Sequence, residues 1–175
     1  TVQIMSYSRQ GRGRGVHCVE RIFRNDGVIH YEGRVHNRLV GVKNPSLSRI
    51  RLLHYGYDLG KGTSETKFQR TEGLLKKDLE ENPGDPYTHH YLSCSYLSRG
   101  MYDRVVFHGR EALRLAAADR NPDVAFLWTR YNLSLAYYRT KNLAAARETA
   151  RESLALFPDH LDAHFMLIVI GFDEE

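Results

Sequence analysis

Apolar residues recur at helical spacing through the last two thirds of the chain, which has 175 residues. Between Lys67 and Glu81 the apolar positions are spaced as on one face of a helix: Phe68, Leu74, Leu75 and Leu79. Two copies of a longer pattern follow, in which Leu-Ser, two further residues and a tyrosine precede a turn and a second helix. The two tyrosines are Tyr96 and Tyr137, 41 residues apart. We therefore expect five or six antiparallel helices from about Thr63 onward, in a right-handed stack of pairs.

The order within each copy is typical of a tetratricopeptide (TPR) repeat, because small residues follow the large and aromatic ones and let two helices pack closely. That repeat has a period of about 34 residues, so about seven residues must be accommodated between the copies. The stretch 116–122 supplies them as an extended helix end and a Pro-terminated loop. His160 to Ile170 would be the first helix of a third copy, with Leu167 in the large-residue position and Gly171 in place of the aromatic.

The first 60 residues have a different pattern. Val19–Arg24 and Val28–Glu32 are expected to pair as a β-hairpin, because Asn25-Asp26-Gly27 supplies the residues that a tight turn needs. A third strand is expected within Ile50–Tyr57. Three strands form no adequate core alone. The predicted fold is therefore mainly α: a TPR-type stack of antiparallel helix pairs in residues 63–175, preceded in residues 1–60 by a small β segment that is the remnant of a larger domain.

Composition changes this picture little. With 42% hydrophobic and 26% charged residues, the chain resembles an ordinary soluble protein, and no apolar run approaches the roughly 20 residues of a membrane span. No signal-peptide pattern opens the sequence. Cys18 and Cys94 lack metal-ligand spacing and are expected to be thiols in a reducing cytoplasm. The net charge of +4 does not argue for an anionic partner, so we expect a cytoplasmic protein without membrane contact or a nucleic acid partner.

No catalytic group of residues stands out in the helical part, where the adjacent His89 and His90 cannot form a metal pair at helical spacing. The concave face of the first helices is the usual binding surface of such a stack. In this sequence that face would carry Tyr87, His90, Cys94, Trp128, Tyr131, Leu135, Tyr138, Arg139 and Phe165. We predict a groove for a protein or peptide, with the partner-binding residues Tyr87, His90, Trp128, Tyr131, Tyr138 and Arg139. The alternative is that some of these aromatic residues belong to the core between repeats.

The last predicted helix is apolar on every side between Met166 and Ile170. Such a helix suits a neighbour better than solvent. Either the parent protein continues beyond this helix, or the chain associates with itself through it.

Four short motifs precede the repeats, one after another: Arg21-Ile22-Phe23-Arg24-Asn25, Tyr31-Glu32-Gly33-Arg34-Val35-His36, His54-Tyr55-Gly56-Tyr57 and Pro83-x-Asp85-Pro86-Tyr87. In this order they resemble the C-terminal part of bacterial family 2 glycosyltransferases that carry TPR tails. The resemblance implies a nucleotide-sugar-binding α/β domain, with a metal-binding Asp-x-Asp, upstream of this region. It also implies Mn²⁺ or Mg²⁺ in the parent enzyme, and no cofactor, metal site or catalytic residue in this chain alone.

The resemblance assigns His36 a metal or diphosphate contact of the parent enzyme, although Asn37 replaces the carboxylate that usually follows. The alternative is that His36 only pairs or caps a strand. Arg12 and Arg14, spaced by glycines, could hold the diphosphate of the sugar nucleotide or RNA, or could belong to a mobile loop.

Three functions stay open on this basis. The first is a TPR protein-interaction module that forms the C-terminal part of a sugar-nucleotide-dependent glycosyltransferase and is inactive alone. The second is a truncated enzyme whose first strands complete the sugar-nucleotide site. The third is a free-standing TPR adaptor that binds a peptide or nucleic acid.

Overall fold

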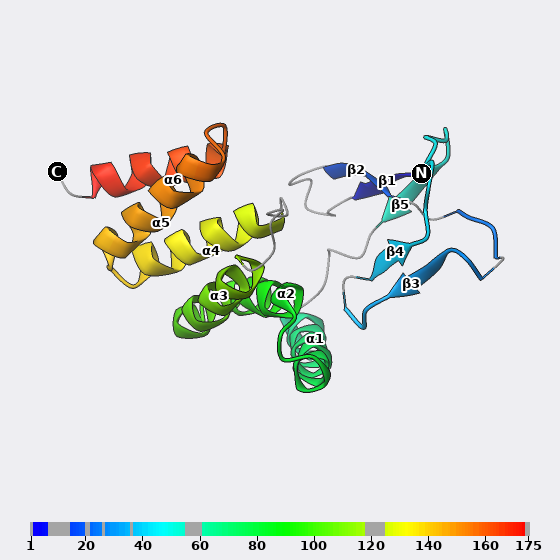
Figure 1. The fold of residues 1–175 in the computed structure, drawn as a ribbon, viewed down its shortest axis with the longest axis horizontal. Coiled ribbons are helices and arrows are strands. Elements are labelled where there is room, and N and C mark those ends of the chain that lie inside the picture. The colour runs from blue at the N-terminus through cyan, green and yellow to red at the C-terminus, as the bar shows by residue number, and fades with distance from the viewer. Residues whose placement is uncertain are drawn as a thin grey trace. The chain divides into compact units, whose positions relative to one another are not determined.

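A computed structural model of the chain describes residues 2–6, 15–19, 22–25, 27–35, 37–54, 61–117 and 125–173. The chain divides into two compact units, Thr1–Arg70 and Thr71–Glu175. The first unit holds all the strands, and the second holds helix pairs (Figure 1). The chain is therefore mainly helical with a small N-terminal β segment, as the sequence predicts.

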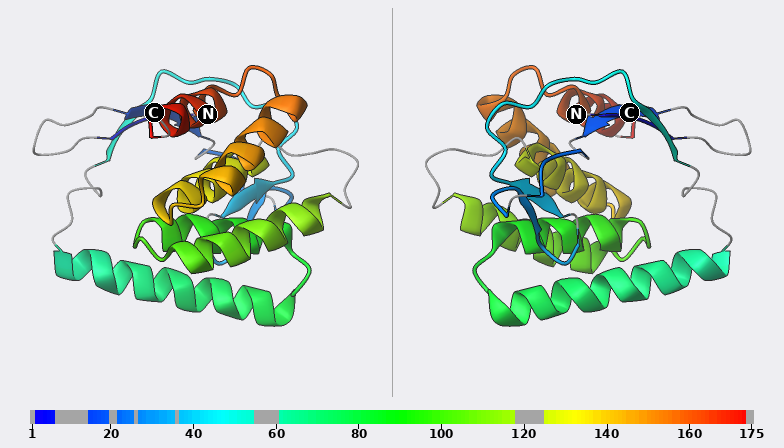
Figure 2. Two further views of the ribbon diagram at one scale, coloured as in Figure 1. Left: turned by 90° about the vertical axis from the view of Figure 1, so that its left-hand side faces the viewer. Right: turned by 90° about the vertical axis from the view of Figure 1, so that its right-hand side faces the viewer.

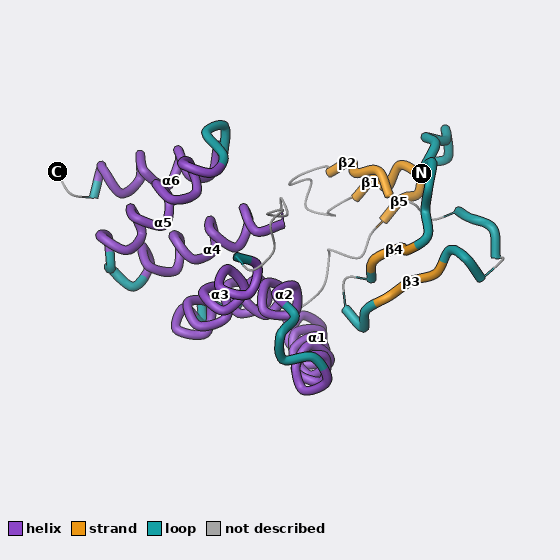
Figure 3. The backbone as a smooth tube through the Cα atoms, viewed as in Figure 1, coloured by secondary structure: helices purple, strands orange, loops and turns teal. Residues whose placement is uncertain are grey.

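The first unit contains two small sheets (Figure 3). In the larger sheet, β1 (Val2–Ser6) lies between β2 (Gly15–Val19) and β5 (Arg51–His54), antiparallel to β2 and parallel to β5. In the smaller sheet, β3 (His30–Glu32) pairs antiparallel with β4 (Arg38–Val40).

This pairing corrects the predicted hairpin. Residues 22–25 form no strand, and β3 pairs with the segment that follows it instead of the segment before it. Gly33 has a φ of +90°, so the chain reverses directly after Glu32. Gly27 also has a positive φ, of +78°, but no strand precedes it within residues 22–25, so only the hairpin at Gly33 forms. The strand expected within 50–57 is observed as β5, and residues 55–57 lie outside the described part of the chain.

The first unit buries few side chains. Between residues 22 and 52, every side chain whose exposure is described is exposed or half-buried. Ile22, Val28 and Leu47 are each at least 60% exposed. The two small sheets therefore gain little stability from apolar burial among these residues.

Six helices follow: α1 (Lys61–Glu81), α2 (Pro86–Leu97), α3 (Tyr102–Ala116), α4 (Ala125–Arg139), α5 (Leu143–Leu156) and α6 (Leu161–Phe172). The longest, α1, has 21 residues and runs without interruption across the division between the units (Figure 2). From α2 to α6 each helix packs on the next, and α2, α4 and α6 also touch in series. The predicted stack of helix pairs is confirmed, with α6 as the first helix of a third pair.

The two helix pairs repeat the same turn. The carbonyl of Tyr96 accepts a hydrogen bond from the backbone N–H of Met101 at 3.1 Å, and the carbonyl of Tyr137 accepts one from Asn142 at 2.9 Å. Gly100 and Lys141, the residues before these donors, have φ values of +66° and +63°. The equivalence of Tyr96 and Tyr137 that the sequence predicts is therefore present in the backbone. The expected loop at 116–122 lies mostly outside the described residues.

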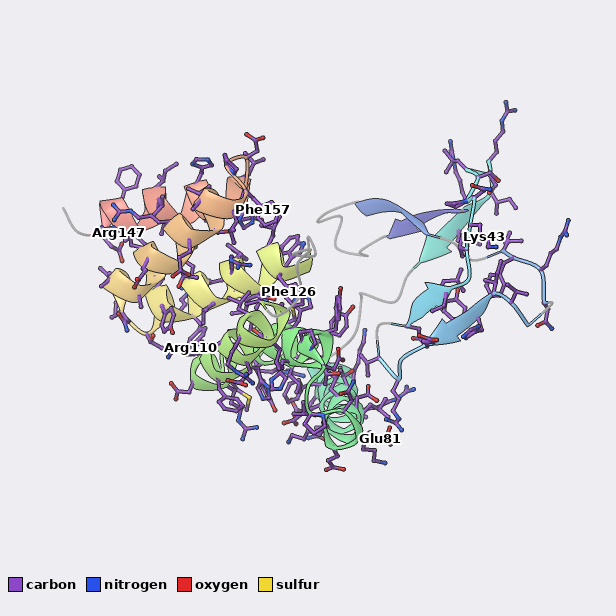
Figure 4. All side chains as sticks on the ribbon, viewed as in Figure 1. Lys43, Glu81, Arg110, Phe126, Arg147 and Phe157 are labelled. Atoms are coloured by element: carbon purple, nitrogen blue, oxygen red, sulfur yellow. The ribbon has the colours of Figure 1, made fainter. Side chains whose placement is uncertain are left out.

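Small residues let the helices approach closely. One core cluster is made of Ala146 and Ala150 on α5 with Ala163, Met166 and Ile170 on α6, each at most 2% exposed. Tyr137 is half-buried against this cluster. The side chains of the stack are shown in Figure 4.

Candidate protein-binding groove

The predicted groove residues occupy matching positions on α2 and α4. Tyr87 corresponds to Trp128 and His90 to Tyr131, each 41 residues later, the spacing of Tyr96 and Tyr137. These residues lie on the first helices of the two pairs, and those helices contact each other. The structure thus brings the two predicted sets together along one row of helices.

Trp128 is the most exposed of the predicted aromatic anchors, at 57% of its surface. Its indole meets the ring of Tyr131, one turn along α4, edge to face, with 6.3 Å between ring centroids and 85° between planes. Tyr131 itself is half-buried against the core cluster of α5 and α6. Trp128 therefore packs against Tyr131 on one side, while more than half of its surface is exposed to solvent.

Tyr87 joins α2 to α4 instead of standing free in a groove. Its ring lies 5.3 Å from the ring of Phe126, which is 4% exposed and sits at the start of α4 (Figure 4). Tyr87 is half-buried as a result. Part of its ring is available to a partner, and part of it belongs to the core between the repeats.

His90 lies beneath the groove and not on its surface, with only 6% of the residue exposed. Its Nδ1 is 2.7 Å from the hydroxyl of Thr129, which is fully buried on α4. Asn132 Nδ2 donates to the Sγ of Cys94 at 3.2 Å, and Cys94 Sγ lies 3.8 Å from His90 Nε2. Polar side chains thus link α2 to α4 by hydrogen bonds below Trp128, and the helical periodicity alone could not distinguish this buried position from a surface one.

Cys94 has little nucleophilic character in this cluster. Burial raises the pKa of its thiol, while the hydrogen bond from Asn132 works in the opposite direction. A thiol held in its protonated form is a poor nucleophile and a poor metal ligand. The cysteine on the predicted concave face therefore serves packing and hydrogen bonding.

The C-terminal end of α4 gives the groove a charged edge. Lys141 Nζ pairs with Asp173 Oδ2 at 3.3 Å, and the pKa of Tyr138 is raised because its hydroxyl is hydrogen-bonded to Asp173. Arg139 is exposed and forms no hydrogen bond or ion pair within the described residues. Phe165 on α6, also predicted for the concave face, is 56% exposed.

The structure adds one contact that the sequence did not suggest. His89 and His108 meet with 3.0 Å between their Nδ1 atoms, and His108 stacks on Tyr96 with ring centroids 5.4 Å apart. Burial lowers the pKa of both imidazoles, that of His108 to about 4, with His89, Arg104 and Lys76 adding to the effect. Both rings are therefore neutral near pH 7, and one can donate a hydrogen bond to the other.

The predicted contacts to a sugar nucleotide involve the first part of the chain. His36, Arg12 and Arg14 lie outside the described residues, so their assignment to a sugar nucleotide or metal stays a prediction. Within the described ranges, no three His, Cys, Asp or Glu side chains are grouped as metal ligands. No helix in the described part of the chain has the length and apolar character needed to cross a membrane.

No protein-family model matches the chain, and no curated protein matches it either. The TPR assignment and the glycosyltransferase resemblance therefore rest on the sequence patterns alone.

Proposed function

We propose that the helical unit is a protein-binding module whose groove, along α2, α4 and α6, takes an apolar segment of a partner protein. The observation that carries the proposal is Trp128, 57% exposed and supported edge-on by Tyr131 at the centre of the row. Tryptophan and tyrosine dominate the binding energy of protein interfaces because they bury a large rigid surface at small cost in conformational entropy. A tryptophan that is both steadied and exposed has the properties of such an anchor.

The groove favours a partner segment that combines apolar and acidic side chains. Trp128, Tyr131 and the open part of Tyr87 offer apolar surface, while Arg139, which has no ion-pair partner among the described residues, places a positive charge at the end of α4. A carboxylate of the partner near Arg139 would gain a charge-assisted hydrogen bond. We therefore assign the groove to a peptide with an aromatic or aliphatic anchor followed by Asp or Glu.

Trp128 is the only tryptophan of the chain, so its fluorescence reports on the groove directly. Peptides selected on the full chain from a random displayed library should shift the emission to shorter wavelength as they cover the indole. The affinity of the best peptide, labelled and measured by fluorescence polarisation, should fall roughly 30-fold in Trp128→Ala, which corresponds to about 2 kcal/mol.

Phe107→Ala is the matched control, because Phe107 is 60% exposed on α3, outside the row of first helices. It should bind the selected peptides as the wild type does. Loss of helical circular dichroism in Trp128→Ala would show that Trp128 is a core residue. Unchanged peptide affinity in a folded Trp128→Ala would reject the groove.

The charged edge has its own test. Arg139→Glu should weaken a selected peptide that contains an acidic residue by roughly tenfold, because attraction becomes repulsion. The same variant should leave the version of that peptide with the acidic residue replaced by Gln nearly unaffected. Equal loss with both peptides would remove Arg139 from the site.

We infer, secondly, that the β unit belongs to a larger glycosyltransferase-like domain. The sequence resemblance supports this inference, and so does the exposure of Ile22, Val28 and Leu47, which a larger domain would cover. The 175-residue chain should then hydrolyse no sugar nucleotide in the presence of Mn²⁺, because the donor-binding half is not part of this sequence. Turnover that disappears in His36→Ala would contradict the inference.

A further inference from the structure

The last helix, α6, is apolar on two opposite faces. One face, Ala163, Met166 and Ile170, is at most 2% exposed and forms part of the core cluster. The other face, which we call the α6 stripe, consists of Leu161, Phe165, Ile168 and Phe172. These four side chains are 79%, 56%, 58% and 75% exposed. Exposed apolar side chains aligned on one element indicate an interaction surface when they form a continuous patch.

The spacing of the stripe is that of a helix–helix contact. Its members follow one another at intervals of four, three and four residues. At 100° per residue, these positions fall within an arc of about 60°. The same alternation of three and four residues places side chains on the contact line of two packed helices, where each inserts between four residues of the facing helix.

The preceding repeat shows what covers this face inside the stack. Thirty-four residues before the stripe, α4 carries Leu127, Tyr131, Ser134 and Tyr138. All four are buried or half-buried. The Ser134 hydroxyl donates to the backbone carbonyl of Ala146 on α5 at 2.8 Å, and Tyr131 and Tyr138 pack against the cluster of α5 and α6. On α4, therefore, α5 and α6 partly cover the face that α6 leaves exposed.

The chemistry of the stripe also favours a helix as its occupant. From Phe165 to Phe172 the sequence contains no charged or hydrogen-bonding side chain. An extended peptide would bring backbone N–H and C=O groups that find no partner on such a surface. A helix satisfies these groups internally and presents only side chains.

We propose that the α6 stripe binds the α6 stripe of a second copy of this chain, as a symmetric dimer. Each copy presents a stripe with the residue spacing of two packed helices. Two stripes related by a twofold axis can therefore pack against each other. With roughly 100 Å² of surface on each side chain, two copies remove about 800 Å² from water. This area lies below the roughly 1,200 Å² at which stable specific interfaces begin and is typical of weak, transient contacts, so the dimer is weak, with a Kd on the order of 10 µM.

Sedimentation equilibrium of the full chain tests the proposal, over concentrations from about 1 to about 300 µM, which bracket that Kd. The apparent mass should rise from that of one chain toward twice that value. Ile168→Glu should weaken the association at least tenfold, because it places an unpaired charge in the contact. Phe107→Glu, at a 60% exposed phenylalanine on α3, should dimerise as the wild type does.

Phe172→Glu, in the last turn of α6, provides a second variant that decides the question should Ile168→Glu lose its helical circular dichroism. A wild-type chain that stays monomeric throughout would overturn the proposal. So would stripe variants that are folded and dimerise normally, or a Phe107→Glu variant that loses dimerisation, since association would then use another surface. The groove is tested separately, because neither Ile168 nor Phe172 is among the predicted groove residues, and Phe165, which belongs to both surfaces, is left unchanged in these variants.

Discussion

At the residue scale, the two repeated turns share one backbone angle and differ in the residue that adopts it. Gly100 and Lys141 both have positive φ values, but glycine adopts them without strain, whereas a residue with a Cβ carries a cost. A Cβ on Gly100 would meet only the ring end of Tyr102, at 3.8 Å. The backbone angle, and not steric crowding, therefore determines what this position accepts.

Gly100→Ala should lower the free energy of unfolding by about 1 kcal/mol, since alanine is strained at this φ. Gly73 gives the matched control, because it is exposed within α1 and a Cβ there meets no atom within 4 Å. Gly73→Ala should raise the free energy of unfolding by up to about 1 kcal/mol, through helix propensity. Urea denaturation measures both, and equal effects of the two substitutions would contradict the argument.

Two matching serines differ in hydrogen bonding. Ser134 Oγ donates to the carbonyl of Ala146 at 2.8 Å, whereas the buried Oγ of Ser93, 41 residues earlier, has no partner within the described structure. Ser134→Ala should therefore lower the free energy of unfolding by about 1 kcal/mol, while Ser93→Ala should be neutral or stabilising. The denaturant midpoints of the two variants measure this difference. A larger destabilisation in Ser93→Ala than in Ser134→Ala would show that Ser93 Oγ forms a hydrogen bond.

Sequence patterns predicted the helix face on which a residue lies, but they did not predict its contact partners. They placed Trp128, Tyr131 and Arg139 on or near an open surface because helical periodicity fixes the direction of a side chain. They could not show that Thr129 lies opposite His90, because that contact joins residues 39 positions apart. The meeting of His89 with His108 was missed for the same reason. Periodicity gives the face of a helix, and only packing shows what lies against it.

At the scale of elements, the helices were predictable and the strand pairs were not. Apolar periodicity is clear in α3 and α5. Local signals mark the start of other helices, such as Asp85 before α2, whose side chain accepts hydrogen bonds from the backbone N–H groups of Tyr87 and Thr88. A strand of three residues such as β3 has too little pattern to select its partner. Gly27 and Gly33 both adopt a positive φ, so turn residues alone did not select which segment pairs with β3.

The pair of helices α2 and α3 should be sensitive to acid. Because the pKa of His108 is lowered from 6.5 to about 4, the unfolded chain binds a proton before the folded chain does as the pH falls. Stability is therefore fully present above about pH 6.5 and is lost progressively toward pH 4. Glu111 opposes the shift, while Arg104 and Lys76 strengthen it.

The urea concentration at the midpoint of unfolding should thus decrease as the pH is lowered from about 7 to about 5. The decrease should be smaller in His108→Gln, which removes the titrating group. His164→Gln is the control, since His164 is exposed on α6 and its ring contacts the carbonyl of Pro158. That variant should keep the full pH dependence. An identical pH dependence in His108→Gln and the wild type would exclude the histidine pair as the cause.

At the scale of the whole molecule, stability is concentrated in the helical unit. Every residue described as buried lies between Leu75 and Ile170, within Thr71–Glu175. Backbone amides of α2, α4 and α5 should therefore exchange most slowly in hydrogen–deuterium exchange, and those of β3 and β4 should exchange orders of magnitude faster. Equal protection of β3 and α4 would show that the first unit has a core outside the residues described.

The two ends of the helical unit carry different surfaces, and this difference limits how far copies can assemble. On α1, the exposed positions between Ser64 and Glu81 are all polar or glycine, in contrast with the apolar stripe of α6. A binding surface that contacts a different surface on the next copy can produce an open fibre. A binding surface that contacts the same surface of a second copy produces a closed dimer. Self-association through the α6 stripe alone would therefore produce pairs at high concentration and no polymers.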